Sequence, residues 1–355
     1  FVDGLRGASM LVILLYHHWT FLGSPRWMVG GRDLLAPVQF GYLGVNLFLV
    51  LSGFCLAYPF WRSPGGPVWG MGLGEFYRRR SVRIAPAYLA TLAVVTVLAF
   101  PQTYRSGAWR DLGWDVAVHL VFLHNLWPET VSSLNPVFWS LALEWQLYLV
   151  FPLLLTVSAK AGPGAMLAGS LLVNLVYRAA IFPACGHLPW KDCWALCYWP
   201  PGRVFEFAMG IAAARWVAAG ELRPRWLRSV PVLWAVAAGA AGLTWWQVSQ
   251  HGRYSPAGDV FSAFVSVALL LLGSKASNAP GSFGMRWLVA AGTISYSIYL
   301  VHWTVGDVLG HHVYPRLAAG SFLKAVVGLA YLPFVVFLGW IWHRLFERPF
   351  LGRRA

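Results

Sequence analysis

The sequence has 355 residues, of which 58% are hydrophobic and 11% are charged, and its mean hydropathy is +0.58. Soluble domains carry about 25% charged residues, so this composition excludes a soluble globular protein and indicates a membrane protein with many spans. The formal net charge of +14 suits basic cytoplasmic loops, and no basic run is interleaved with base-stacking aromatic residues, so we reject nucleic-acid binding.

Ten apolar stretches are long enough to cross a bilayer. They lie at 5–22, 40–60, 84–101, 138–158, 164–182, 201–219, 229–250, 258–274, 286–309 and 321–345. The first has no cleavage site of small residues and reads as a true span, although the chain opens on Phe1 instead of Met and we expect residues before it.

Segment 112–127 is a weaker candidate, because polar residues interrupt it. We interpret it as a re-entrant or interfacial helix, since such residues are tolerated at membrane depth where they do not face lipid. The sequence therefore predicts an all-α, polytopic membrane helix bundle of about ten transmembrane helices plus this segment, in a single domain over residues 1–355. The polar residues are Asp111, Asp115, His119, His124 and Asn125.

Basic residues are distributed unevenly between the two sides of this predicted bundle. The side of the first helix's start holds 14: Arg62, Arg78, Arg79, Arg80, Arg83, Lys160, Arg223, Arg225, Arg228, Lys275, Arg286, Arg348, Arg353 and Arg354. The other side holds eight: Arg26, Arg32, Arg105, Arg110, Lys191, Arg253, Arg316 and Lys324. Because cytoplasmic loops carry the excess of Lys and Arg, we expect both termini to be cytoplasmic, in a plasma-membrane protein.

Three cysteines, Cys185, Cys193 and Cys197, fall in the predicted outward loop between the fifth and sixth spans. A disulfide persists on that side, but three cysteines leave one over and the sequence does not choose the pair. Their spacing with His187 also permits a metal site. Cys55 lies in a predicted helix and no further ligand is near, so we expect no metal.

The first span carries a cation near its start and a titratable ring near its end. Arg6 and His17 are eleven positions apart, which is about three helical turns, so both lie on one face about 16 Å apart along the axis. His18 points about 100° away from that face. Ionisable groups inside a membrane are functional candidates by default. A structural hydrogen bond for His17 and a snorkelling role for Arg6 are the alternative.

A run of arginines precedes the third span in the sequence EFYRRRSVRIAPAY, which we interpret as a cytoplasmic loop that reaches the mouth of that span. Positive-inside bias explains one or two arginines, but not four within six residues. Arginine forks bind phosphate bidentately, so Arg79, Arg80 and Arg83 indicate a polyphosphate ligand, with lipid headgroups as the alternative. No P-loop sequence is present.

Polar residues also lie inside three apolar spans, and in two of them they recur at helical spacing. Asn46 lies in the second span, and Ser140, Glu144 and Tyr148 form a stripe at i, i+4 and i+8 in the stretch that begins near Trp139. Glu144 needs a partner such as an arginine or histidine on another helix. Ser295, Tyr299 and His302 lie at i, i+4 and i+7 in the ninth span; a lone histidine there is more often a packed residue than a catalyst.

Together these motifs resemble the acyltransferase-3 family of integral membrane acyltransferases. The resemblance covers nearly the whole chain. It rests on DGLRG with Arg6 and His17, GVNLFLVLSGF at 44–54, the Arg79, Arg80 and Arg83 pattern, WSLALEWQLYL at 139–149, SYSIYLVH at 295–302 and FERP at 346–349. The larger members carry a fused extracytoplasmic hydrolase-like domain, which we do not expect in this protein from the sequence given; this counts against a peptidoglycan or cell-wall role, although many members do without the domain.

The resemblance implies an acyl-CoA donor, with acetyl-CoA first among the candidates, taken from the cytoplasm. It also implies a hydroxyl acceptor: a glycan, a lipid-linked sugar or a secondary metabolite. It carries the functional roles onto Arg6, His17, Arg79, Arg80 and Arg83, and onto Glu144 beside His17 as catalytic. We expect the substrates to contact Asn46, Trp139, Ser140, Tyr148, Tyr299 and His302.

The chemistry of His17 has two interpretations. A neutral imidazole accepts the proton of the acceptor hydroxyl as that hydroxyl attacks the thioester. Alternatively, His17 takes the acyl group covalently and passes it on. The competing class of function is a proton-coupled secondary transporter or exporter that uses the same buried ionisable residues. Proton coupling does not need a cytoplasmic arginine cluster, and the hydropathy shows no inverted halves.

Overall fold

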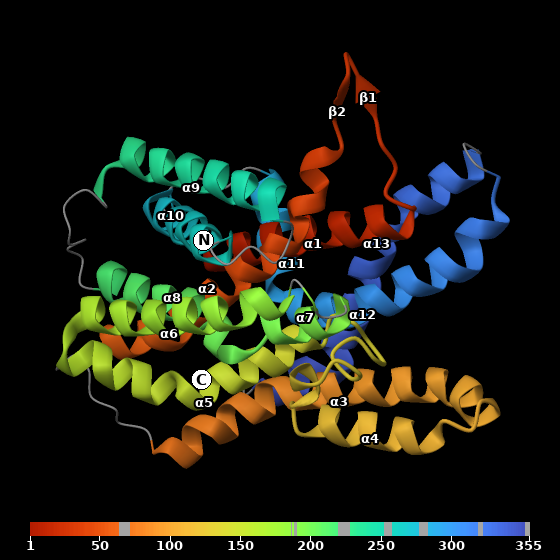
Figure 1. Ribbon diagram of the computed structural model, residues 1–355, viewed down its shortest axis with the longest axis horizontal. Helices are drawn as coiled ribbons and strands as arrows, with labels where there is room; N and C mark the ends of the chain where they lie inside the picture. The colour runs from red at the N-terminus through yellow and green to blue at the C-terminus, as the bar shows by residue number, and fades with distance from the viewer. Residues whose placement is uncertain are drawn as a thin grey trace.

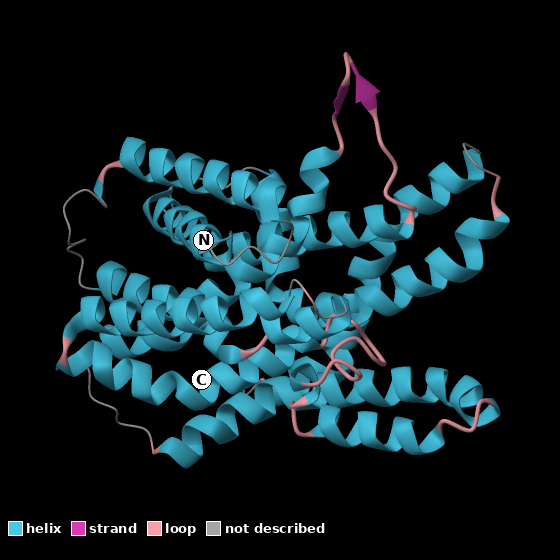
Figure 2. Cartoon of the chain, in the orientation of Figure 1, coloured by secondary structure: helices cyan, strands magenta, loops and turns pink. Residues whose placement is uncertain are grey.

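The computed structural model describes residues 1–63, 72–185, 187, 190–218, 228–251, 258–276, 283–318 and 322–351. Over these residues the chain is helical almost throughout (Figure 2), which confirms the all-α prediction. The described strands are β1 (Met28–Val29) and β2 (Arg32–Asp33), which pair antiparallel. This hairpin projects away from the helices (Figure 1).

Thirteen labelled α-helices account for most of the described chain. They are α1 (Val2–Phe21), α2 (Gly44–Trp61), α3 (Leu73–Arg105), α4 (Trp109–Leu120), α5 (Trp139–Lys160), α6 (Gly162–Cys185), α7 (Trp190–Cys197), α8 (Val204–Ala218), α9 (Val230–His251), α10 (Gly258–Ala276), α11 (Phe283–Thr293), α12 (Ser295–Val308) and α13 (Phe322–Trp342). Short 3₁₀ and π segments lie at η1 (Ala36–Leu43), η2 (His124–Leu126), η3 (Pro200–Gly202), η6 (Leu309–Val313), η7 (Tyr314–Arg316), η8 (His343–Glu347) and η9 (Arg348–Phe350).

Several of these helices are long and apolar enough to span a membrane. Among the described residues, six helical stretches meet that requirement, and seven do if a bent pair counts as one span. The chain is therefore a polytopic membrane protein, while the predicted count of about ten spans is not confirmed. The predicted spans themselves correspond to helices, since each of the ten apolar stretches overlaps at least one helix.

Glycines permit the closest helix packing in the bundle, as small residues do where membrane helices cross. At the crossing of α2 and α8, a Cβ on Gly53 would overlap the carbonyl oxygen of Phe207, and a Cβ on Gly210 would overlap that of Val50. The two backbones are therefore in direct contact. This contact places the polar residues of α2 against those at the start of α8.

The ninth predicted span, 286–309, is not one continuous helix. It divides into α11 and α12, which meet at an angle of 83°. Hydropathy does not detect such a break, because both halves are apolar. The break lies at Ile294, and Thr293 and Ser295 on either side of it line a cavity.

The arginine run is helical, contrary to our interpretation of it as a loop. The helix α3 begins at Leu73, so Arg79, Arg80 and Arg83 lie on its first turns and their directions follow the helical repeat. The segment 112–127, predicted to be re-entrant or interfacial, includes most of the short helix α4, which lies beside α3 (Figure 1), and the short segment η2. Five basic residues used for the topology prediction lie outside the described residues: Arg223, Arg225, Arg253, Arg353 and Arg354.

Candidate active site

Arg6 and His17, the two candidate residues of the first span, line two different cavities of the bundle. The first, which we call the arginine cavity, is lined by Arg6, Arg80, Arg83, Glu144, Tyr148 and Tyr299 among others. The predicted stripe on α5 is confirmed here, since Ser140, Glu144 and Tyr148 all face this cavity. It therefore combines three guanidinium groups with two carboxylates, those of Glu144 and Glu347.

The arginines of this cavity differ in their contacts. Arg6 lies 3.6 Å from Asp3 and donates to the Sγ of Cys55 at 3.5 Å. The Nε of Arg80 is buried and has no hydrogen-bond partner within the part of the chain that the structure describes. A buried donor without a partner costs free energy, so this group is suited to an anionic ligand that enters the cavity.

Arg79 lies apart from the arginine cavity. Its Nε is 2.6 Å from Glu75, and its side chain is 56% exposed. Neighbouring helical positions point about 100° apart, so Arg79 and Arg80 cannot share a face. The role of Arg79 in donor binding stays a prediction, and the geometry favours Arg80 and Arg83 over it.

Glu144 has hydroxyl partners instead of the basic partner expected from the sequence. Its Oε1 accepts hydrogen bonds from Ser52 at 2.6 Å and from Tyr148 at 2.6 Å. Ser140 makes a separate contact, with its Oγ 2.7 Å from the hydroxyl of Tyr299. The carboxylate is thus held in place by α2 and α5 at the edge of a cavity that also contains arginines.

The second cavity, which we call the His17 cavity, is lined by His17, Asn46, Trp139, Arg178, Asp259 and Tyr299 among others. Its aromatic wall includes Trp139, which stacks on Tyr198 with ring centroids 3.6 Å apart. Val45 and Tyr299 line both cavities. They therefore form the partition between the arginines and His17.

His17 contacts His302, which lies 285 positions further along the chain. The Nδ1 of His17 is 2.9 Å from the Nε2 of His302. His302 is fully buried, and its Nδ1 is 2.7 Å from the carbonyl oxygen of Tyr299. His302 thus reaches the site through His17, although we expected it to contact substrate.

His18 points to another part of the bundle, as the helical repeat predicts. Its ring stacks on Tyr331 of α13, with centroids 4.4 Å apart and planes within 9°. His18 is absent from the lining of both cavities. The two adjacent histidines therefore have different environments, and His17 alone of the two shares a cavity with the polar groups of α2, α6 and α10.

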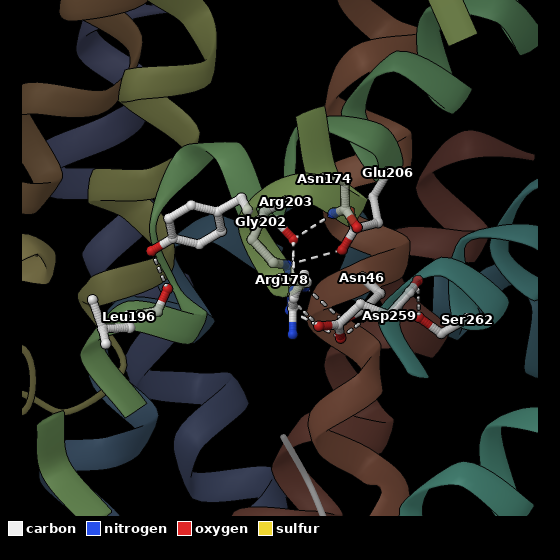
Figure 3. Close-up of polar contacts among 10 residues, drawn as sticks. Asn46, Asn174, Arg178, Leu196, Gly202, Arg203, Glu206, Asp259 and Ser262 are labelled. Carbon is white, nitrogen blue, oxygen red and sulfur yellow. Dashed lines mark hydrogen bonds and ion pairs between the residues drawn. The ribbon is translucent and has the colours of Figure 1, made fainter. Parts of the chain in front are cut away.

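Four ionic side chains form a cluster beside the His17 cavity (Figure 3), and three of them, Arg178, Arg203 and Asp259, line it. Asp259 pairs with Arg178 and lies 3.0 Å from Arg203, which in turn lies 2.9 Å from Glu206. Asn46 joins this group, since it accepts from Arg203 at 2.8 Å and donates to Asp259 at 3.1 Å. Two positive and two negative charges give the cluster no net formal charge.

The sequence interpretation missed the members of this ion cluster other than Asn46. Arg178, Arg203 and Glu206 are buried, with side chains 3% exposed or less, and Asp259 is 13% exposed. Each lies in or beside a predicted span, and an arginine or carboxylate within a span is a signal in its own right. Asn46, which we expected to contact substrate, holds the cluster together and also lines the cavity.

The loop cysteines are resolved into one pair and one thiol. Cys185 and Cys193 form a disulfide, and Cys197 is a buried free cysteine that lines the His17 cavity. The Sγ atoms of all three lie within 4.8 Å of one another. A disulfide sulfur is not a thiolate ligand, so this pairing removes two ligands from the metal alternative.

Comparison with known proteins decides the family. Residues 1–349 match the sequence profile described as the acyltransferase domain. The chain belongs to the acyltransferase-3 family. This membership makes acyl transfer its class of chemistry, in preference to transport. It also confirms the resemblance drawn from the motifs.

Two relatives show how broad the acyltransferase-3 family is. The chain is 28% identical to acyltransferase MdmB of Streptomyces mycarofaciens, over 91% of this chain and 85% of the relative. It is 24% identical to the peptidoglycan O-acetyltransferase OatA of Listeria monocytogenes, over 86% of this chain but 49% of the relative. The chain therefore spans about half the length of that second relative. No solved structure matches this one.

Proposed function

We propose that this protein is an O-acyltransferase that takes a short acyl group, acetyl in the first instance, from cytoplasmic acyl-CoA and transfers it to a hydroxyl. The acceptor is a glycan, a lipid-linked sugar or a small secondary metabolite. The observation that carries the proposal is that the arginine cavity and the His17 cavity adjoin at Val45 and Tyr299. A charged donor and a hydroxyl acceptor can thus approach one another from two compartments.

The arginine cavity supports the donor half of the proposal. Arg6, Arg80 and Arg83 come from two helices and face one cavity, and guanidinium forks match the geometry of phosphate oxygens. The phosphates of CoA would bind there. The rise of α1 separates Arg6 from His17 by about 16 Å, a length comparable to an extended pantetheine arm.

The His17 cavity supports the acceptor half. Ligand sites combine apolar and aromatic walls with a few placed polar groups, and this cavity offers Trp139, Tyr198 and Trp303 beside the ion cluster. A hydroxyl-bearing ring would lie against these side chains. The acetylated polymer in the name of the Listeria relative is itself a glycan.

In the chemical step, His17 acts as general base. It accepts the proton of the acceptor hydroxyl while the hydroxyl oxygen attacks the thioester carbonyl carbon and the carbon–sulfur bond breaks. His17 then returns that proton to the CoA thiolate, so the products are an ester and CoA. Such proton transfer contributes about 10²–10⁴-fold to rate. No metal and no covalent acyl-histidine enter this scheme.

Product analysis tests the proposal as a whole. Purified protein in detergent is incubated with isotope-labelled acetyl-CoA and host-cell extract, and the products are identified by mass spectrometry. We expect labelled ester on a hydroxyl-bearing molecule together with stoichiometric free CoA. Label that stays on CoA with every extract, or that is released as free acetate at the rate of a buffer control, would contradict the proposal.

Donor binding depends on the arginines of α3 in this proposal. Arg80→Ala and Arg83→Ala should raise the Kd for acetyl-CoA, by about tenfold each, because a hydrogen bond between charged groups contributes about 1.5–3 kcal/mol. Isothermal titration of the purified variants measures the effect. Arg78→Ala is the matched control, because Arg78 is 67% exposed and pairs with Glu75. Unchanged binding in the Arg80/Arg83 double variant would refute the donor site.

In this proposal Glu144 has a supporting role. Its hydrogen bonds with Ser52 and Tyr148 hold the wall of the arginine cavity in place. Glu144→Gln keeps an oxygen that can accept both hydrogen bonds but removes the charge. We expect kcat to fall by less than it falls when His17 is replaced. Turnover of acetyl-CoA measures both variants side by side, and a Gln variant as inactive as the His17 variant would make the carboxylate the central group.

The orientation in the plasma membrane follows from the positive-inside count and is supported by the disulfide in the loop 183–200. Disulfides persist outside the cytoplasm, so this loop would be extracytoplasmic and both termini cytoplasmic. Reporter fusions after Ala355 and near Lys191 should therefore report opposite sides. Two fusions that report the same side would contradict the predicted orientation.

A further inference from the structure

His302 lies at the centre of the bundle, where both of its ring nitrogens have partners. Its Nδ1 is 2.7 Å from the carbonyl oxygen of Tyr299, and its Nε2 is 2.9 Å from the Nδ1 of His17. The side chain is 0% exposed. These contacts determine where the protons of both rings lie.

The direction of both hydrogen bonds follows from the carbonyl oxygen of Tyr299, because it is the one partner that cannot donate. A carbonyl oxygen accepts, so the Nδ1 of His302 must carry its proton. In neutral His302 the Nε2 is then the acceptor, and the Nδ1 of His17 must donate to it. In neutral His17 the lone pair is therefore on Nε2. One backbone carbonyl thus sets the tautomer of two histidines in sequence.

The ring geometry agrees with a hydrogen bond in the plane of the rings. The two imidazoles are within 18° of parallel, yet their centroids are 5.1 Å apart, which fits rings joined edge to edge through nitrogen atoms. The ring of Trp303 meets His17 at 85° with centroids 5.0 Å apart. His17 is thus held both by a hydrogen bond and by an aromatic contact.

We infer that His302 is a positioning residue that makes His17 a base, by holding it in the tautomer with its lone pair on Nε2. The inference rests on the proposed function for the identity of the base. When His17 takes up the acceptor's proton on Nε2, its Nδ1–H bond to His302 persists. The proton stays on His17 until it leaves with the CoA thiolate, because the Nδ1–H of His302 faces a carbonyl and has no acceptor to which it can pass a proton.

The first test reads the tautomer directly in the unaltered protein. The ¹⁵N chemical shifts of histidine distinguish protonated from unprotonated ring nitrogens, and comparison with His17→Gln assigns the His17 signals in a lipid-reconstituted sample. We expect a protonated Nδ1 and an unprotonated Nε2 for His17. A proton on Nε2 of His17 in the wild type would overturn the inference.

The second test separates positioning from packing. His302→Phe keeps an aromatic ring but removes the acceptor, whereas His302→Gln places an amide oxygen near the position of Nε2. At metal sites, loss of the group that orients a ligand histidine costs roughly 10–100-fold, and by analogy we expect kcat of His302→Phe to fall by that factor with the KM for acetyl-CoA little changed. His302→Gln should recover most of kcat.

The outcomes distinguish this inference from the proposed function. If His302→Phe keeps both wild-type kcat and the wild-type His17 tautomer, the inference is wrong and His17 can still be the base. If His17→Ala remains active, the base assignment fails, whatever the spectra show. If His302→Phe does not fold, the wild-type spectrum alone decides the tautomer, since it needs no variant of His302.

Discussion

Replacing His17 by Ala is expected to abolish acyl transfer while leaving acetyl-CoA bound. The imidazole faces the cavity opposite the arginines, so its loss removes the base but none of the phosphate contacts. General base catalysis is worth about 10²–10⁴-fold, and kcat should fall by that factor or more. Turnover of labelled acetyl-CoA measures the loss, and isothermal titration measures the Kd for acetyl-CoA, which should stay close to the wild-type value.

The adjacent histidine is the matched control for this experiment. His18→Ala removes a ring of the same kind from the same helix, but that ring stacks on Tyr331 and faces neither cavity. We expect this variant to keep most of its activity, with any loss explained by stability in a thermal-shift assay. A folded and active His17→Ala variant would refute the mechanism and leave Glu144 as the next candidate base.

The second large effect is on stability. Asp259→Ala should destabilise the fold by about 3–5 kcal/mol, because removing one partner of a buried ion pair leaves an uncompensated buried charge. Here two guanidiniums, those of Arg178 and Arg203, lose the carboxylate between them. Thermal unfolding in detergent, followed by tryptophan fluorescence, should show a lower Tm for the variant.

A carboxylate at the surface provides the comparison. Asp307 on α12 has a side chain that is 48% exposed and pairs with the exposed His311, so Asp307→Ala should change Tm little. Asp259→Asn should lie between the two, because the amide keeps hydrogen bonds but not the charge. Equal Tm values for Asp259→Ala and Asp307→Ala would show that the ion cluster does not stabilise the protein.

Local patterns in the sequence predicted the helices well, because a long apolar stretch that is buried in lipid or protein must satisfy its backbone hydrogen bonds internally, as a helix does. The stripe on α5 was also predictable, since Ser140, Glu144 and Tyr148 recur at the helical repeat and face one cavity. The break between α11 and α12 was not, because Thr293 barely interrupts an otherwise apolar stretch. The helical form of the arginine run was not predictable from hydropathy either, because these charged residues precede the apolar part of α3.

Contacts between distant helices account for the rest of the site. Helical spacing along α1 distinguishes His17 from His18. No local pattern predicts the contact between His17 and His302, because His302 is 285 positions away. The same applies to the ion cluster, in which Arg178 of α6 and Asp259 of α10 meet Arg203 just before α8 (Figure 3). Arg203 and Glu206 are three positions apart and pair locally, but the partners of the other charges depend on how the helices pack.

The partition at Val45 and Tyr299 has a consequence for the membrane as a whole. An open channel between two polar cavities would let ions and protons leak and would dissipate the gradients that the membrane maintains. One aliphatic and one aromatic side chain lie where the arginine cavity and the His17 cavity adjoin, and the tyrosine hydroxyl donates a hydrogen bond to the carbonyl of Val137 at 3.1 Å. An acyl group of two carbons needs little room to pass such a barrier. In the proposed reaction, donor and acceptor would therefore meet from the two cavities while the bilayer stays sealed.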